Sequence, residues 1–309
     1  MTDLLKKYLF ETRTVRVQAV RLTDTWRDAQ AHHAYPQAIQ RLLGELVAAS
    51  SLLAANIKFD GSLILQIQGD GPIALLVVEC RSDLSVRATV KVREGHTVPE
   101  DGTMQNLLNA HGNGRFMVVL DPHRKVPGQQ AYQGIVPLEG ESVAEALQHY
   151  MKASEQLETR LWLAADDKSA AGLLLQRLPD HGGEDRPQVT AEVAAEAWSR
   201  ALHLGGTLAA DELLATDTDT LIHRLFWEET LIAFEPQPVR WFCPCTRERV
   251  AAMLRTLGQA EVEDILAERG EVEVTCDFCG KPYAFDPVDC AGLFSPATPM
   301  PEQDPPTVH

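Results

Sequence analysis

Four cysteines near the C-terminus constrain this chain more than any other feature of its sequence. Cys243 and Cys245 form a C-x-C motif, and Cys276 and Cys279 form a C-x-x-C motif after a spacer of thirty residues. Two close pairs separated by a spacer can place four thiolates around one tetrahedral zinc ion. The pattern therefore predicts a small module built around one zinc ion per chain.

Three other interpretations compete with a structural zinc site, namely two buried thiol pairs that bind nothing, a disulfide framework and a catalytic metal. Charged residues interrupt the first twenty positions, so we expect no secretory signal and a cytoplasmic protein, whose thiols stay reduced and can hold metal. A catalytic zinc keeps an open coordination position, and the ten histidines form neither an H-E-x-x-H nor an H-x-E motif. Spacing alone leaves open whether the zinc is inert or part of a switch.

The residues around the two cysteine pairs predict regular structure. Thr246 can cap a helix that Gly258 ends. A second helix is expected over Ala260–Arg269, and a hairpin is expected from strands at Glu271–Val274 and Lys281–Phe285. The cysteines therefore belong to a compact module with secondary structure of its own.

The composition argues against two classes of partner. The chain has 309 residues, a net charge of −16 and a pI near 5.0, whereas nucleic-acid binding depends on Lys and Arg. The segment from Arg240 to Phe294 has six Lys or Arg and ten Asp or Glu. No stretch reaches the roughly 18 apolar residues that a membrane helix needs. We therefore expect neither nucleic acid nor a membrane as a partner.

The first 179 residues show the patterns of an α+β domain with an antiparallel sheet and packed helices. Alternating apolar residues predict a strand over Arg13–Leu22, and a helix is expected to follow from Thr25. A long helix with a broad apolar face is expected from Pro36 through Leu53. Short turns then separate three strands of an expected antiparallel meander, over Leu63–Ile67, Ile73–Cys80 and Leu84–Val92.

The rest of this domain predicts a hairpin, a capped helix and two further elements. The hairpin pairs Phe116–Leu120 with Tyr132–Val136. Ser142 and Glu145 form a capping box for a helix that runs to about Gln156. The last strand is predicted over Arg160–Ala165, and a short apolar helix is predicted over Ala170–Leu178.

We divide the chain into four parts, which are an α+β core domain (1–179), a metastable helical linker (180–238), a four-cysteine zinc-binding module (239–295) and a disordered tail (296–309). The breaker-rich run His181–Pro187 marks the first boundary. The short helical stripes between Gln188 and Glu229 can bury their apolar faces only on another part of the protein, because short helices are marginal alone. Four prolines in the last twelve residues indicate disorder.

Three weaker signals favour ordinary structure over function. Gly112 and Gly114 meet neither the Walker nor the Rossmann spacing and predict a tight turn. The pair His32-His33 has no acid or nucleophile beside it and predicts a polar helix end. Cys80 lies in a predicted strand and is expected to be a buried apolar residue. No catalytic residue is predicted, and we expect that the protein is not an enzyme.

Several longer motifs occur along the chain. Around the cysteines they are Phe234-Glu-Pro-Gln-Pro-Val-Arg, Arg247-Glu-Arg-Val and Val274-Thr-Cys-Asp-Phe-Cys-Gly. Upstream they are Phe59-Asp-Gly, Gln68-Gly-Asp-Gly-Pro, Tyr132-Gln-Gly-Ile-Val-Pro-Leu-Glu-Gly and Ser154-Glu-Gln-Leu. In this order and spacing they resemble the redox-regulated bacterial heat-shock holdases, the thirty-three-kilodalton chaperone family. The resemblance covers nearly the whole chain, up to about Phe294.

The resemblance implies an ATP-independent chaperone that is zinc-bound and inactive when reduced. It implies that the four cysteines are both zinc ligands and redox sensors. Oxidation is then expected to form the disulfides Cys243–Cys245 and Cys276–Cys279, release zinc, unfold the linker and produce a homodimer that holds unfolding client proteins. Cys290 lies just beyond the motif and can trap a wrong disulfide, and Glu158 stands where the family often carries proline.

A second hypothesis, from a different class, stays open at this point. It is a zinc-module scaffold that binds one fixed protein partner and has no redox role. A holdase would suppress the aggregation of unrelated proteins only after oxidation, whereas a scaffold would lose its function with its zinc. If the linker helices pack partly against the zinc module, unfolding of the module would expose their apolar faces at Trp198 and Leu221–Phe226.

Overall fold

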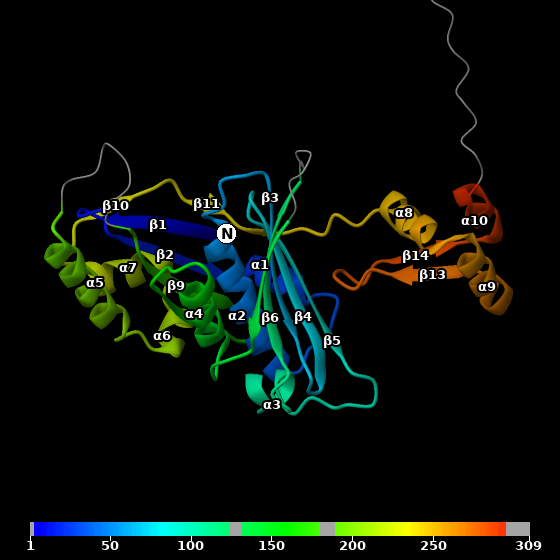
Figure 1. Cartoon of the computed structure of the whole chain (residues 1–309), viewed down its shortest axis with the longest axis horizontal. Helices are drawn as coiled ribbons and strands as arrows, with labels where there is room; N and C mark the ends of the chain where they lie inside the picture. Colours follow the sequence, from blue (N-terminus) through cyan, green and yellow to red (C-terminus); the bar gives the residue numbers. More distant parts are fainter. Residues whose placement is uncertain (1–2, 124–130, 180–188, 295–309) are drawn as a thin grey trace, which may run out of the picture. The chain divides into compact units, whose positions relative to one another are not determined.

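The computed structural model describes residues 3–123, 131–179 and 189–294, and Figure 1 shows the order of their helices and strands. The chain divides into two compact units, Met1–Cys243 and Pro244–His309. The expected tail, 296–309, and the boundary run His181–Pro187 lie outside the described residues.

The larger unit contains two sheets. The first sheet has the order β10-β1-β2-β9-β8, with β11 also paired to β1, and all its described pairings are antiparallel. Its strands are β1 (Leu4–Phe10), β2 (Val15–Leu22), β8 (Thr159–Ala165), β9 (Ala170–Arg177), β10 (Leu231–Ala233) and β11 (Gln237–Pro238). The strands β10 and β11 therefore bring residues from late in the chain onto the first strand.

The second sheet contains the predicted meander and hairpin. Its order is β12-β5-β4-β3-β6-β7, and β12 is parallel to β5. Its strands are β3 (Gly61–Gln68), β4 (Ile73–Arg81), β5 (Ser85–Val92), β6 (Arg115–Pro122), β7 (Tyr132–Pro137) and β12 (Arg240–Trp241). The predicted pairing of Phe116–Leu120 with Tyr132–Val136 is confirmed, residue against residue.

The long helix α2 (Gln37–Ala54) contacts strands of both sheets. Of its 18 residues 13 are buried, so it lies inside the core instead of covering its surface. At Gly44 the helix passes so close to β8 that an added Cβ atom would lie 2.4 Å from the Cβ of Ala165.

The unit is completed by α1 (Asp24–Gln30), α3 (Met104–Leu108) and α4 (Val143–Ser154). The predicted cap of α4 is present, because Ser142 accepts a hydrogen bond from the Glu145 amide.

One sequence prediction for this unit is wrong. Residues 170–178 were expected to form a short helix, but Ala170–Arg177 form β9, so Arg160–Ala165 is not the last strand. Strand β9 lies between β2 and β8 and is buried on both faces. Leu174 faces the cluster around α2, whereas Leu173 and Leu175 face a second apolar cluster. A strand buried on both faces shows an unbroken apolar run, and periodicity cannot distinguish such a run from a buried helix.

The predicted helical segment after residue 188 forms α5 (Ala191–Gly205), α6 (Ala210–Ala215) and α7 (Thr218–Phe226). The buried face of these helices lies on the first sheet, where Ala197, Leu221 and Leu225 share one cluster with Val17 and Leu173. The stripe predicted at Trp198 and Leu221–Phe226 is buried in this cluster. The short helices thus obtain their support from β1, β2, β8 and β9.

The smaller unit contains α8 (Arg247–Leu257), α9 (Gln259–Arg269), β13 (Val272–Thr275), β14 (Pro282–Phe285) and α10 (Pro287–Phe294). The first four elements confirm the predicted helices and hairpin. Thr246 caps α8 by accepting a hydrogen bond from the Arg249 amide, and Gly258, with φ of +104°, separates the two helices. Among the described residues of this unit, seven buried ones form its core: Ala251, Leu254, Val262, Val272, Tyr283, Phe285 and Cys290.

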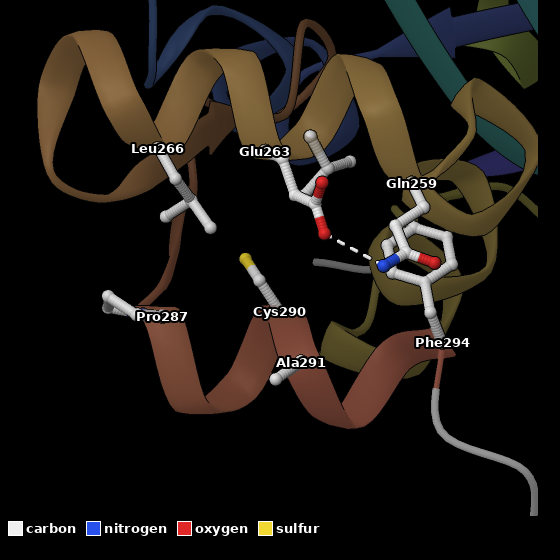
Figure 2. A pocket seen from close by; sticks show the side chains of 8 residues that line it. Gln259, Glu263, Leu266, Pro287, Cys290, Ala291 and Phe294 are labelled. Carbon is white, nitrogen blue, oxygen red and sulfur yellow. Dashed lines mark hydrogen bonds between the residues drawn. The ribbon is translucent and has the colours of Figure 1, made fainter.

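A cavity of about 370 Å³ lies between α9 and α10 of the smaller unit. Figure 2 shows the Cys290 side chain rising from α10 toward α9, with Leu266 and Glu263 on the opposite side. Burial raises the pKa of the Cys290 thiol, and Asp289 and Asp286 raise it further. Cys290 is therefore a buried core residue with little thiolate character. In the described part of the chain, no helix is long and apolar enough to span a membrane.

Candidate metal centre

The four predicted cysteines come together. The sulfur atoms of Cys243, Cys245, Cys276 and Cys279 all lie within 4.8 Å of one another, and all four residues are half-buried. The Sγ atoms of Cys245 and Cys279 are 3.2 Å apart, well beyond the roughly 2.05 Å of a disulfide bond. A tetrahedral ion with Zn–S distances of about 2.3 Å holds its sulfurs about 3.8 Å apart. Four cysteine sulfurs that all lie within 4.8 Å of one another are a donor set that fits zinc.

Local structure explains how three of the sulfurs converge. Cys245 directly precedes Thr246, the N-cap of α8, so the start of this helix fixes the position of the residue. Cys276 follows β13, and the turn to β14 is closed by the Gly280 amide, which donates to the Cys276 carbonyl over 2.8 Å. Gly280 has φ of +64° and permits this turn, which carries Cys279.

Cys243 reaches the group from the end of the larger unit. It follows β12 by one residue, Phe242, whose amide donates to the Val86 carbonyl over 3.1 Å. The strand β12 is thus hydrogen-bonded to β5 almost up to the first cysteine. Cys243 therefore lies two residues beyond β12 in the sequence.

A tyrosine that was not predicted from the sequence contacts the group of four cysteines. Tyr283 in β14 is 6% exposed, and its hydroxyl donates a hydrogen bond to the Cys245 Sγ over 3.2 Å. This hydrogen bond raises the pKa of Tyr283, and burial and the charge of the neighbouring thiolates raise it further. The available signal was the position of Tyr283 four residues after Cys279, on the strand that returns from the C-x-x-C turn.

An arginine fixes the elements that surround the centre. Arg247, in the first turn of α8, donates to the Ala284 carbonyl over 2.6 Å and pairs with Asp289 over 2.6 Å. Its guanidinium also lies over the Phe285 ring, 4.2 Å from the ring centroid. One side chain thus ties the helix that follows Cys245 to both β14 and α10.

The remaining sequence candidates lie elsewhere. Cys80 is fully buried in the α2 cluster, and burial raises the pKa of its thiol. His32 and His33 follow the end of α1, and Gly112 lies in a turn whose amides at His111 and Asn113 donate to Asp70. Within the described ranges, the four cysteines are the one group of three or more metal-binding side chains that lie together.

Known proteins match this chain over nearly its whole length. A family model described as Hsp33 protein matches residues 3–286. A 33 kDa chaperonin from Methylobacillus flagellatus is 46% identical over 305 residues, which cover 98% of each chain. A 33 kDa chaperonin from Chromobacterium violaceum is 48% identical over 292 residues, which cover 94% of each chain.

The fold is also similar to that of a solved structure. The crystal structure of a 33 kDa chaperonin from Thermotoga maritima matches with a TM-score of 0.78 and 22% identity, and the match covers 95% of this chain and 98% of that chain. The predicted α+β class with a C-terminal cysteine module is thereby confirmed. The matched family model and the curated relatives also confirm the predicted family, and this chain belongs to the Hsp33 family.

Proposed function

We propose that this protein is a redox-regulated, ATP-independent holdase that acts in the cytoplasm by binding unfolding proteins, not by catalysis. The observation that carries the proposal is the group of four sulfurs within 4.8 Å of one another in a chain of a chaperone family. In the reduced state Cys243, Cys245, Cys276 and Cys279 would hold one zinc ion, and the protein would be inactive. The bound zinc would keep the four thiols deprotonated and would hold the smaller unit folded.

The size of the smaller unit supports this dependence on metal. Its core consists of seven buried residues, which is little for an independent domain. Zinc binding to a cysteine-rich module contributes about 10–16 kcal/mol apparent, comparable with the roughly 5–15 kcal/mol that stabilises a whole domain. Loss of the four thiolates would therefore unfold the unit.

Oxidation of the thiolates would provide that loss. In each close pair, Cys243–Cys245 and Cys276–Cys279, two thiolates give up two electrons and form one S–S bond. One hydrogen peroxide molecule accepts the two electrons and, with two protons, becomes two water molecules. Thiolate is the form that peroxide attacks, so the reduced centre is stable and still oxidisable.

The client-binding surface would come from the contact between the linker helices and the first sheet. Helices α5–α7 cover an apolar sheet surface that includes Phe10, Val17 and Leu175. The segment between these helices and Cys243 pairs with both sheets through β10, β11 and β12. We propose that unfolding of the smaller unit loosens this segment, that the linker 180–238 then detaches, and that the exposed apolar surfaces hold clients and form a homodimer.

One experiment separates this function from a fixed zinc scaffold. Zinc content and free thiols are measured on one sample before and after mild peroxide, together with suppression of the aggregation of a heat-unfolded client. We expect one zinc per chain to leave as four thiols disappear and holdase activity appears. Zinc that stays bound, or equal activity in both states, would favour the scaffold with a structural metal.

A further inference from the structure

Tyr283 places a polar group at a position where packing alone requires only an aromatic ring. The residue lies opposite Val274 in the β13–β14 hairpin and belongs to the core of the smaller unit. A phenylalanine would fill the same space. The hydroxyl adds one contact, the hydrogen bond that it donates to Cys245 over 3.2 Å.

A hydrogen bond of this kind acts differently on a metal-binding sulfur and on a disulfide sulfur. A metal-binding cysteine sulfur carries negative charge, and hydrogen bonds to charged groups are roughly twice as strong as neutral ones. The sulfur of a disulfide is neutral. The hydrogen bond that Tyr283 donates therefore fixes the position of the Cys245 sulfur and favours it as a metal ligand over its disulfide form.

A neighbouring cation strengthens the donor. The Lys281 ammonium lies 5.3 Å from the centroid of the Tyr283 ring, over its face. A positive charge at this position draws electron density from the ring and makes the phenolic hydrogen a better donor. The backbone carbonyl of Lys281 also accepts a hydrogen bond from the Cys276 amide over 3.0 Å, so the two residues belong to one rigid turn.

We propose that Tyr283 is a positioning residue that holds Cys245 in its metal-binding form and so sets the oxidant concentration at which the centre opens. The inference rests on the proposed redox function and adds a determinant of its threshold. Loss of the hydroxyl has two consequences. Zinc is retained less tightly, and the sulfur, which has lost one hydrogen bond, reacts faster with peroxide.

The test is the variant Tyr283→Phe, which keeps the ring. Zinc affinity is measured on the full-length reduced protein by competition with a chelator, and thiol loss is timed under limiting peroxide. Removal of a group that supports a metal ligand typically lowers metal affinity about 10- to 100-fold, and we expect a decrease in that range with faster thiol loss. Tyr132→Phe is the matched control, because Tyr132 is 45% exposed and its hydroxyl donates to Glu155.

The outcomes distinguish this inference from the function on which it rests. Unchanged zinc affinity and unchanged thiol loss in Tyr283→Phe would overturn the role of Tyr283, whatever the wild type does. Zinc retained by the oxidised wild type would overturn the switch itself. If Tyr283→Phe fails to fold, Lys281→Met decides, because it keeps the tyrosine and weakens the donor. For Lys281→Met, a decrease in zinc affinity that is smaller than the about 10- to 100-fold expected for Tyr283→Phe supports the proposal. Zinc affinity equal to that of wild type contradicts it.

Discussion

The rings of Phe10 and Phe226 meet edge to face, with their centroids 5.7 Å apart and their planes at 73°. Phe10 ends β1, and Phe226 ends α7. Both rings are almost completely buried in the cluster between the first sheet and the helices α5–α7. This pair therefore joins the first strand of the chain to the last helix of the proposed linker.

Substitution of Phe226 by alanine should release the linker without oxidant. Deleting a buried phenylalanine side chain costs about 3–5 kcal/mol, and most of that loss falls on the contact between α7 and the sheet. We expect Phe226→Ala to suppress client aggregation under reducing conditions while it still contains zinc. Limited proteolysis should cut it faster than wild type between residues 189 and 230.

The adjacent aromatic residue provides the control for that experiment. Trp227 is 68% exposed, so Trp227→Ala removes as large a ring without opening the core. It should resemble wild type in both assays. Equal protease resistance of Phe226→Ala and wild type would contradict the idea that this packing holds the linker in place.

Elements that depend on neighbouring residues were predictable from the sequence, whereas those that depend on distant residues were not. Thr246 and Gly258 define the ends of α8 through local backbone chemistry, and both were identified correctly. Strand β9 was mistaken for a helix because the cover on both of its faces comes from α2 and from α5–α7, far away in sequence. The short strands β10–β12 were missed because they exist only by pairing with β1 and β5.

The candidate metal centre also has one feature that the sequence predicted and one that it did not. Spacing alone predicted that the four cysteines lie together, because two close pairs can supply the four ligands of a tetrahedral site. The contact between Tyr283 and Cys245 depends on the register of the β13–β14 hairpin, in which Tyr283 lies opposite Val274. A shift of the register by two residues leaves the alternation along a strand unchanged, so the pattern did not predict the hydrogen bond.

Removal of zinc from the reduced protein should unfold the smaller unit and leave the larger unit folded. The reason is the difference between their cores, because the smaller unit has seven buried core residues and the larger has two extensive clusters. A strong chelator with excess reductant should abolish the protection of the α8 and α9 amides from hydrogen exchange. The α2 amides should stay protected, and protected α8 amides in the zinc-free protein would contradict a metal-dependent fold.

Glu45 should make the larger unit more stable at mildly acidic pH. Burial within α2 raises its pKa to about 7, and the charge of Arg41 only partly opposes this. A carboxyl whose pKa is higher in the folded than in the unfolded state binds more protons when folded, so it favours folding at low pH. This contribution to the stability is fully present below pH 4.5, the ordinary pKa of the carboxyl, and is lost as the pH rises through about 7.

Denaturant unfolding at pH 5.5 and pH 8 tests this expectation. The stability of the larger unit, followed by the fluorescence of the five tryptophans, all of which lie before Cys243, should decrease between the two pH values in wild type. The decrease should be smaller in Glu45→Gln, which cannot ionise, and unaltered in Glu139→Gln, whose side chain is exposed. The same pH dependence in all three proteins would exclude Glu45 as its source.

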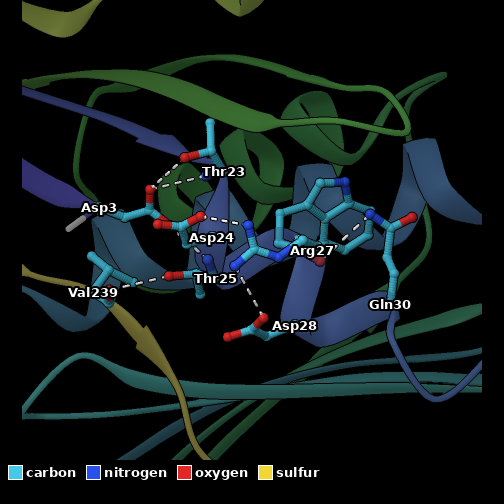
Figure 3. Close-up of polar contacts among 9 residues, drawn as sticks. Asp3, Thr23, Asp24, Thr25, Arg27, Asp28, Gln30 and Val239 are labelled. Atoms are coloured by element: carbon cyan, nitrogen blue, oxygen red, sulfur yellow. Dashed lines mark hydrogen bonds and ion pairs between the residues drawn. The ribbon is translucent and has the colours of Figure 1, made fainter. Parts of the chain in front are cut away.

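A network around Asp3 should control how easily the segment before the metal centre detaches (Figure 3). Asp3 accepts hydrogen bonds from the amides of Thr23 and Thr25 over 3.0 and 2.7 Å. The Thr25 hydroxyl donates to the Val239 carbonyl over 3.1 Å, and the Val239 amide donates to the Asp3 carbonyl over 2.9 Å. The residue between β11 and β12 is thus tied to the start of the chain.

The variant Thr25→Val keeps the shape of this side chain and removes its hydroxyl, which leaves the buried Val239 carbonyl without that donor. An unsatisfied buried polar group costs about 1–3 kcal/mol, so amide exchange over residues 237–242 should become roughly 5- to 150-fold faster, at about 1.4 kcal/mol per tenfold. Thr97→Val, at an exposed loop position, should have no effect on that exchange.

Because this segment leads directly into Cys243, Thr25→Val should also reach full holdase activity sooner after peroxide, at an unchanged rate of thiol loss. A change in thiol loss without faster exchange would place the effect at the metal centre and contradict the role of the segment.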